Sequence, residues 1–304
     1  MADCYENIRR YVDYVDRTSP TGLTSWGRGD WVPVKSHSSK ELTSSVYFYV
    51  DTKILANAAK MFNKTEDYKY YSALANKIKN AINDKFLNRE TGIYGSGVQT
   101  EQSVPLQWGI VPEELKRKVA RNLAKQVEAA GFHLDVGVLG AKAILNALSE
   151  NGEAETAYKL AAQDTYPSWG CWIANGATTL LENWDLNATR DISDNHMMFG
   201  EIGGWFYKGL GGIFPDPENP GFKHILLRPN FPSGLNEFEA RYQSPYGEIC
   251  SKWERKKNRI FYHVTVPANS TATFYAPDNV KGERAVNLEA GEHILELLLL
   301  RSSK

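Results

Sequence analysis

The stretch GGIFPDPENPGF, residues 211–222, separates two parts of the chain that follow different hydrophobic patterns. Before it, apolar residues recur at the three- and four-residue spacing of amphipathic helices. After it, apolar and β-branched residues alternate in short runs between turn-forming residues, which is typical of strands. Its proline-rich part, FPDPENPGF at residues 214–222, predicts a linker or domain edge. We therefore expect a helical segment over residues 1–213 and a β domain over residues 214–304.

The helical part is organised as consecutive helices with two kinds of connection. Short polar turns alternate with long loops rich in glycine, tryptophan and tyrosine, at residues 18–37, 87–99 and 164–175. Helix hairpins whose elaborated loops lie mostly at one end suit a helical toroid better than a compact bundle. The predicted helices cover residues 1–15, 41–62, 65–86, a segment after Pro112, 136–149, 154–163, 176–184 and 195–210.

The β part contains apolar or alternating runs separated by turn signals such as PSG, SPYG and PDN. Strands at this spacing are typical of a β-sandwich of about 90 residues. The sequence thus predicts a multidomain α and β protein, in which a partial helical toroid precedes an antiparallel β-sandwich. The predicted strands are HILLRPN (224–230), FEARYQS (238–244), GEICSKWE (247–254), RIFYHVTV (259–266), TATFYA (271–276) and HILELLL (293–299).

The overall composition argues against several classes of protein. The chain has 304 residues and a formal net charge of −1, which is not the electrostatic footprint of a nucleic-acid or anionic-membrane binder. There is no apolar run of about eighteen residues and no basic-then-apolar leader, so we expect neither a membrane span nor a signal peptide, and the compartment stays unknown. Cys4, Cys171 and Cys250 are odd in number and far apart. We therefore expect no disulfide framework, no metal and no cofactor.

The first candidate segment for a binding site is SWGRGDWVP, residues 25–33. A sugar ring offers apolar C–H faces and polar hydroxyl edges. A tryptophan beside a carboxylate, here Trp31 beside Asp30, is therefore typical of the wall of a sugar pocket. A packed loop that contains a structural Arg28–Asp30 pair explains this segment equally well.

Two further loops contain residues of the same kind. His133 and Asp135 lie just before a predicted helix, where Asp135 also suits the N-cap position. Trp169 and Trp172 lie in a predicted loop, where neighbouring tryptophans serve either as core residues or as a platform for a sugar. Each of these loops alone favours the structural interpretation.

The strongest candidate is ATTLLENWDLNATRDISDNHMMFG, residues 177–200. Glu182 lies near the end of a predicted short helix, just before Trp184, and His196 begins the next predicted helix. Antiparallel consecutive helices would bring the glutamate and the histidine to the same end of the structure. A carboxylate beside aromatic surface there suits a general base. The competing interpretation is an exposed glutamate at a helix end.

Together these segments resemble the bacterial α-L-rhamnosidases of glycoside hydrolase family 78. The matching pieces follow the order of the family over nearly the whole chain, and the combination of YPSW, GATT, Glu182 and an Asn-His pair is specific. The resemblance implies an (α/α)6-barrel catalytic domain followed by a C-terminal β-sandwich, in agreement with the hydrophobic patterns. The matching pieces are GRGDWVP, QTEQSVPLQWGIVPEEL, HLDVGVLG, YPSWGCWIANGATTLLENW, NHMMFGEIGGWFY, KGLGGI, PGFKHILLRPN and SPYGEICSKW.

The resemblance also implies a reaction and a set of site residues. The family removes terminal α-L-rhamnose with inversion: one carboxylic acid protonates the leaving oxygen, and a carboxylate roughly 6.5–9.5 Å away activates water. By motif, the general base falls on Glu182 and a sugar-binding histidine falls on His196. Pocket-lining positions fall on Asp30, Trp31, His133, Trp169, Trp172 and Trp184.

Two departures from the family pattern qualify this expectation. The base is flanked as Leu181-Glu182-Asn183-Trp184 instead of Trp-Glu-Arg-Trp, and the loop to His196 is short, which affects contacts at the pocket rim. The family's acidic motif with the general acid does not occur in the sequence. We therefore expect the acid and the first part of the barrel upstream of Met1, which leaves open whether this chain alone is active.

Two other functions stay open at this point. A catalytically inactive fragment or a carbohydrate-binding protein of the same fold would bind rhamnose without turnover. Another (α/α)6 glycosidase, such as a fucosidase or a trehalase-like hydrolase, would cleave a different sugar. The expected partners are rhamnose-containing glycosides or oligosaccharides, and the expected protein contacts are an oligomer or upstream domains of the same protein.

Overall fold

The computed structural model describes residues 2–300 of the 304-residue chain, which divides into two compact units. One unit comprises the chain up to residue 147 together with residues 163–199. The other comprises residues 148–162 and the chain from residue 200 onward. Between residues 2 and 300, no helix combines the length and the apolar character needed to cross a membrane.

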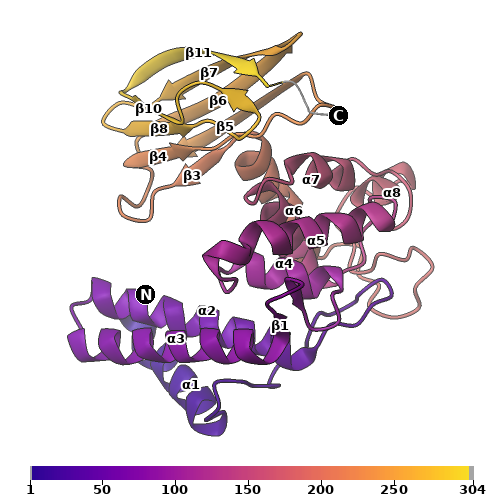
Figure 1. Cartoon of the computed structure of the whole chain (residues 1–304), viewed down its shortest axis with the longest axis vertical. Coiled ribbons are helices and arrows are strands. Elements are labelled where there is room, and N and C mark those ends of the chain that lie inside the picture. Colours follow the sequence, from indigo (N-terminus) through magenta and orange to yellow (C-terminus); the bar gives the residue numbers. More distant parts are fainter. Residues whose placement is uncertain (1, 301–304) are drawn as a thin grey trace. The chain divides into compact units, whose positions relative to one another are not determined.

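The first unit begins with α1 (Tyr5–Thr18), α2 (Lys40–Met61) and α3 (Thr65–Phe86). Figure 1 shows α2 and α3 lying side by side along their length. α2 buries residues around most of its circumference, whereas α3 buries a single stripe, so α2 is the inner helix of the pair. The Ser39 hydroxyl caps α2 by accepting a hydrogen bond from the Leu42 N–H at 3.2 Å.

The middle of the first unit continues the pattern of inner and outer helices. The hairpin of β1 (Leu87–Asn88) and β2 (Ile93–Tyr94) leads into α4 (Gln99–Gln107), in which eight residues are buried. A 3₁₀ turn (Glu113–Leu115) and α5 (Lys116–Ala129) follow. The buried side of α5 includes Val119, Leu123 and Val127, which recur every four residues. The helix predicted over 136–149 is confirmed as α6 (Val138–Ser149).

The segment after residue 163 differs from the prediction. α8 (Trp169–Ala174) lies where we predicted a loop, and residues 176–184, predicted as a helix, have no helical structure. The helix begins early because the Ser168 hydroxyl caps it, accepting a hydrogen bond from the Cys171 N–H at 3.0 Å. It ends early because Gly176 adopts a φ of +89°, which terminates a helix.

The second unit contains short helices as well as strands. α7 (Ala154–Ala161) confirms the helix predicted over 154–163. α9 (Glu201–Trp205) continues into a π-helical turn (Phe206–Leu210). The single helix predicted over 195–210 is therefore wrong, because the helical structure there is short and interrupted. Glycines at positions 200, 203 and 204 weaken a continuous helix in this region.

The strands of the second unit form two sheets, in the orders β10-β8-β4-β3 and β5-β6-β7-β11-β9. Neighbouring strands are antiparallel except β4 and β8, which are parallel. The bounds are Ile213–Pro215 for β3, His224–Leu227 for β4, Glu237–Ser244 for β5, Gly247–Lys256 for β6, Arg259–Val266 for β7, Thr271–Tyr275 for β8, Val280–Lys281 for β9, Ala285–Leu288 for β10 and Gly291–Leu299 for β11.

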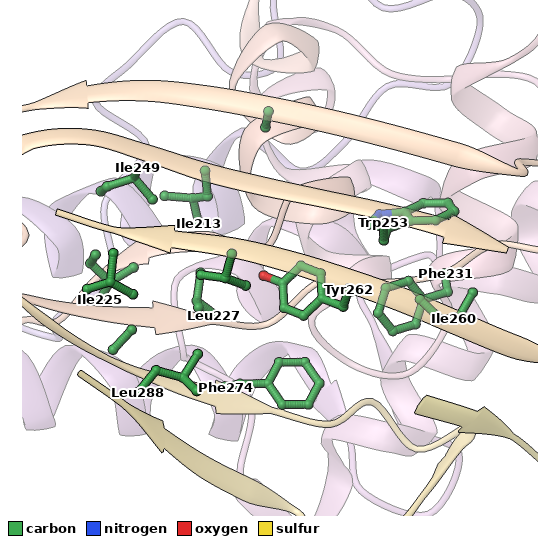
Figure 2. Close-up of a cluster of buried hydrophobic side chains, with 14 of the residues drawn as sticks. Ile213, Ile225, Leu227, Phe231, Ile249, Trp253, Ile260, Tyr262, Phe274 and Leu288 are labelled. Atoms are coloured by element: carbon green, nitrogen blue, oxygen red, sulfur yellow. The ribbon is translucent and has the colours of Figure 1, made fainter. Parts of the chain in front are cut away.

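Apolar side chains from both sheets share one core (Figure 2). Every second residue of β7 faces inward, from Ile260 to Val266. Tyr262 of β7 meets Phe274 of β8, in the opposite sheet, with ring centroids 5.3 Å apart. This packing of two sheets through alternating residues is that of a β-sandwich.

The proline-rich segment predicted as a linker is part of the second unit. β3 pairs with β4, so residues 216–223 form the loop between two strands of one sheet. The Asp216 carboxylate fastens this loop by accepting hydrogen bonds from the Glu218 N–H at 3.0 Å and from the Asn219 amide at 2.8 Å. The linker interpretation is therefore wrong, and the alternative interpretation, a domain edge, stays a prediction. The division into a catalytic segment and a C-terminal domain at residues 213 and 214 stays a prediction.

Candidate functional site

The loop that carries Glu182 folds back on itself. The Glu182 N–H donates to the Ser193 carbonyl, and the His196 N–H donates to the Leu180 carbonyl, each at 2.9 Å. The hydroxyl of Thr179 adds a third link to the Asp194 carbonyl. Glu182 and His196 therefore lie on two facing arms of one loop, not at the ends of two helices as predicted.

The side chains of Glu182 and His196 point toward each other. Glu182 Oε1 lies 3.9 Å from His196 Nε2, which is too far for a direct hydrogen bond. The second oxygen, Oε2, accepts a hydrogen bond from the Ser193 N–H at 3.2 Å. His196 Nδ1 accepts from the Met198 N–H at 3.2 Å, which in a neutral ring places the proton on Nε2, toward the carboxylate. Two polar atoms thus converge on a point that a third group can occupy.

A packed aromatic cluster lies beside this loop. Trp172 stacks on Trp184 with ring centroids 4.8 Å apart, and Phe199 approaches Trp184 to 4.3 Å. The exposed fractions of Trp169, Trp172 and Trp184 are 4%, 2% and 1%. Each indole N–H donates to a backbone carbonyl, and that of Trp184 reaches Val136 at 2.8 Å. The three tryptophans therefore support the loop from the core, and their predicted contact with a sugar stays a prediction.

Asp30 lies at the N-terminus of α6 in space, although it is distant in sequence. Oδ2 accepts from the Gly137 N–H at 2.8 Å, and Oδ1 accepts from the Leu139 and Gly140 N–H groups at 2.7 and 3.1 Å. The Thr100 hydroxyl of α4 donates a fourth hydrogen bond, at 2.5 Å. Burial raises the pKa of Asp30, and these four hydrogen bonds oppose part of that rise. The carboxylate thus joins the 25–33 loop to two helices.

The backbone next to Asp30 makes an equally close contact. The Trp31 carbonyl accepts a hydrogen bond from the Val138 N–H at 2.9 Å. A Cβ atom at Gly137 would lie 2.2 Å from the same carbonyl oxygen, a distance that no side chain tolerates. The glycine of the DVGVLG motif is therefore required by the close approach of the Trp31 backbone.

Asp135 and His133 also fasten loops. The Asp135 carboxylate accepts hydrogen bonds from the Lys35 and Ser36 N–H groups at 2.9 and 3.0 Å. The N-cap role predicted for Asp135 is therefore wrong, since Asp30 binds the first N–H groups of α6 instead. The His133 ring hydrogen-bonds through Nδ1 to the Ala130 carbonyl at 3.2 Å and through Nε2 to the Thr165 hydroxyl at 2.8 Å. His133 thus has partners for both ring nitrogens, and its contact with substrate stays a prediction.

Glu101 is a buried carboxylate that the sequence interpretation did not single out. It is 2% exposed, in the first turn of α4. Oε1 accepts from the Ser39 N–H at 2.7 Å, and Oε2 accepts from the Ser96 N–H and hydroxyl at 2.7 and 2.8 Å. The only feature of the local sequence that could have indicated this role is that Glu101 is the single charged residue of its helix, QTEQSVPLQ. Glu101 holds the loop before α2 against the loop before α4.

A pocket of about 510 Å³ lies between the loop that contains Asp30 and the loop that contains Glu182. This volume falls within the range of ligand pockets. Of the predicted site residues, Asp30 and Trp31 line the pocket, whereas Glu182 and His196 do not. Asn183, which directly follows Glu182, does line it. The lining residues are Arg28, Asp30, Trp31, Val32, Pro33, His37, Asn183, Ala188, Thr189, Arg190 and Asp191. Between residues 2 and 300, no three His, Cys, Asp or Glu side chains gather in a way that could hold a metal ion.

Comparison with known protein families and structures gives a consistent result. Residues 1–210 match the bacterial α-L-rhamnosidase 6 hairpin glycosidase domain, and residues 212–291 match the bacterial α-L-rhamnosidase C-terminal domain. An α-L-rhamnosidase of Formosa agariphila is 29% identical over 319 residues, covering 100% of this chain and 34% of its own length. One of Streptomyces avermitilis is 27% identical, covering 91% of this chain and 27% of its own length.

The similarity extends to solved structures. The α-L-rhamnosidase from Dictyoglumus thermophilum superposes with a TM-score of 0.88 at 32% identity, over 98% of this chain and 37% of that one. The Streptomyces avermitilis α-L-rhamnosidase complexed with L-rhamnose superposes with a TM-score of 0.83 at 27% identity, over 98% of this chain and 30% of that one. The predicted fold class, helices of the (α/α)6-barrel type followed by a β-sandwich, is confirmed. The chain spans about a third of the length of the curated relatives it matches.

Proposed function

Because the chain belongs to the bacterial α-L-rhamnosidase family, we propose that it takes part in removing terminal α-L-rhamnose from glycosides by an inverting mechanism. The observation that supports this proposal is the convergence of Glu182 Oε1 and His196 Nε2 on one loop. Asn183, Arg190 and Asp191 of the same loop line a pocket of sugar-binding size. The substrates are rhamnose-containing glycosides or oligosaccharides, and no cofactor takes part.

In the proposed reaction, Glu182 is the general base. The Ser193 N–H holds Oε2, so Oε1 remains available to a water molecule. The water oxygen attacks the anomeric carbon as its proton passes to Glu182, while the bond from that carbon to the glycosidic oxygen breaks. Attack from the face opposite the leaving group inverts the configuration.

His196 is proposed to hold the sugar. Its Nε2–H points to the same space as Glu182 Oε1, and the 3.9 Å gap leaves room for both to bind a third group. A rhamnose hydroxyl in that space would accept from the imidazole while the carboxylate engages the water. Asp30 acts through the backbone that it fastens, which holds Trp31 in the pocket wall.

An inverting reaction also requires a general acid for the leaving oxygen. We propose that the acid comes from outside residues 1–304. This assignment is supported by the engagement of three carboxylates of the first unit, since Asp30, Glu101 and Asp135 already accept hydrogen bonds from backbone N–H groups. The proposal therefore separates the activation of water by Glu182 from the protonation of the leaving oxygen. Each of these two steps can be measured alone.

The experiment compares two rhamnosides that differ in their need for an acid. A 2,4-dinitrophenyl α-L-rhamnoside has a leaving group that departs without protonation, whereas a methyl α-L-rhamnoside needs the acid. We expect the chain to hydrolyse the first and not the second, and NMR should find β-L-rhamnose as the first product. Glu182→Gln should lower the rate about 10²–10⁴-fold, since that is the usual contribution of a general base.

The control is Glu283→Gln, a change at an exposed glutamate of the second unit, which should leave the rate unchanged. A Glu182→Gln rate within about tenfold of the wild type contradicts the base assignment. Rhamnose binding without hydrolysis of either compound favours the alternative of a carbohydrate-binding protein. Faster cleavage of an aryl fucoside or glucoside favours another glycosidase of the same fold.

A further inference from the structure

The pocket between the two loops contains arginines that form no ion pair. Arg28 comes from the 25–33 loop and Arg190 from the loop that contains Glu182, and both line the pocket. Among residues 2–300, neither guanidinium lies within ion-pair distance of a carboxylate, whereas six other arginines of this part of the chain form ion pairs. Unpaired guanidinium groups in a pocket wall are free to bind an anion from solution.

One of the two arginines is also held in place. The Arg28 guanidinium lies over the Trp31 ring, 5.5 Å from the ring centroid, which is a cation–π contact. The indole therefore restricts the guanidinium without using its N–H donors. Because those donors stay available, the contact leaves Arg28 ready for a planar, bidentate partner.

The two carboxylates that line the same pocket, Asp30 and Asp191, form no ion pair with either arginine. Asp30 directs both oxygens to the N–H groups at the start of α6 and to Thr100. Asp191, which has a φ of +55° in the turn after Arg190, is the second carboxylate of the wall. It suits a hydroxyl of a sugar, since an ionised carboxylate only accepts hydrogen bonds.

We propose that this pocket binds an anionic sugar unit, the residue to which the terminal rhamnose is attached. The anionic group, a uronate carboxylate or a sulfate ester, would lie between Arg28 and Arg190, the sugar ring would face Trp31, and Asp191 would accept from a hydroxyl. We place this sugar next to the cleaved bond because Asn183 in the pocket wall directly follows Glu182. That placement rests on the proposed function, in which Glu182 is the general base. The preference for an anion rests only on the arginines.

The test measures binding to the full 304-residue chain by ligand-observed NMR, using D-glucuronate, D-glucose 6-sulfate and D-glucose as separate probes. We expect at least one anion to bind about fivefold tighter than glucose, since an exposed ion pair contributes up to about 1 kcal/mol. The anion that binds more tightly identifies the substituent. Raising the salt concentration from about 0.05 M to about 0.5 M should reduce the preference, because exposed charges are screened.

Substitutions test which side chains cause the preference for the anion. Arg28→Gln and Arg190→Gln should each reduce the ratio of anion affinity to glucose affinity, and the double variant should abolish the preference for the anion. Arg190→Lys should keep part of it, since the charge remains without the bidentate fork. The matched control is Arg10→Gln, at an exposed arginine of α1 outside this pocket, which should retain the full preference.

Equal affinity for both anions and glucose would overturn the inference, as would an anion preference that survives in the double variant. Hydrolysis of the aryl rhamnoside is measured in parallel. Loss of hydrolysis in Glu182→Gln with the anion preference intact supports both proposals. An anion preference in a chain that neither binds nor cleaves rhamnosides supports the pocket and refutes the proposed function, so the two failures are distinguishable.

Discussion

Asp30 and Leu139 lie 109 positions apart in sequence, yet the carboxylate of Asp30 accepts the N–H of Leu139 at 2.7 Å. A carboxylate at a helix N-terminus satisfies N–H groups that have no partner inside the helix, and it complements the helix dipole. Most N-caps are local in sequence. Here the cap of α6 comes from a distant loop, so it also fixes that loop against the helical scaffold.

Replacing this carboxylate should weaken the fold. Asp30→Asn keeps the shape of the side chain but turns an amide NH₂ group toward N–H donors, leaving part of the helix terminus unsatisfied. We expect the free energy of unfolding to fall by about 1–3 kcal/mol, measured by urea unfolding. Asp84→Asn, at an exposed position on α3, is the control and should change it by less than about 0.5 kcal/mol. Equal destabilisation by both changes would contradict the capping role.

The same residue predicts an unusual dependence of stability on pH. Burial raises the pKa of Asp30, so the folded protein binds this proton more tightly than the unfolded chain does. Between the ordinary aspartate pKa of about 3.9 and the raised pKa, the contribution of Asp30 to the free energy of unfolding falls as the pH rises. The stability difference between wild type and Asp30→Asn should therefore shrink as the pH increases through this window. Urea unfolding at a series of pH values measures it, and a growing difference would refute the raised pKa.

The tryptophan cluster should affect both stability and the site. Trp184→Phe removes the indole N–H that donates to the Val136 carbonyl and leaves that buried carbonyl without this partner. We expect a loss of about 1–3 kcal/mol in unfolding free energy. Because Trp184 lies two residues after Glu182, hydrolysis of the dinitrophenyl rhamnoside should also slow.

The control for Trp184→Phe is Trp26→Phe. Trp26 is 60% exposed and packs only against Tyr11 and Tyr14 among the ring contacts of the described residues. Thermal unfolding should detect a large shift for Trp184→Phe and a small one for Trp26→Phe. Similar shifts for the two variants would mean that the cluster does not support the loop.

The hydrophobic patterns predicted the long elements well. Thr65–Phe86 and Arg259–Val266 form the helix and the strand expected of them, since their periodicity alone defines a buried face. Short elements were predicted less well. Around Glu182, a run of apolar residues predicted a helix, but its backbone hydrogen bonds go to the other arm of the loop, at Ser193 and His196. The sequence of residues 176–184 alone contains no information about that pairing.

Some features of the candidate site were predictable from the sequence, and others were not. Glu182, His196 and Trp31 were identified from residue types and from the order of motifs, which are properties of the chain itself. The buried role of Glu101 was not, because its partners Ser39 and Ser96 belong to other loops. The unpaired arginines of the pocket were also invisible, since pairing depends on which loops meet.

By itself, then, the sequence determined the two kinds of architecture and the residue types available for chemistry, because periodicity and composition are local. Only the tertiary structure decided that Asp30, and not Asp135, caps α6. Both carboxylates precede that helix in sequence, and both are suited to the role. The choice depends on where the chain returns in space, since a hydrogen bond requires atoms within about 3 Å of each other, whatever their separation along the chain.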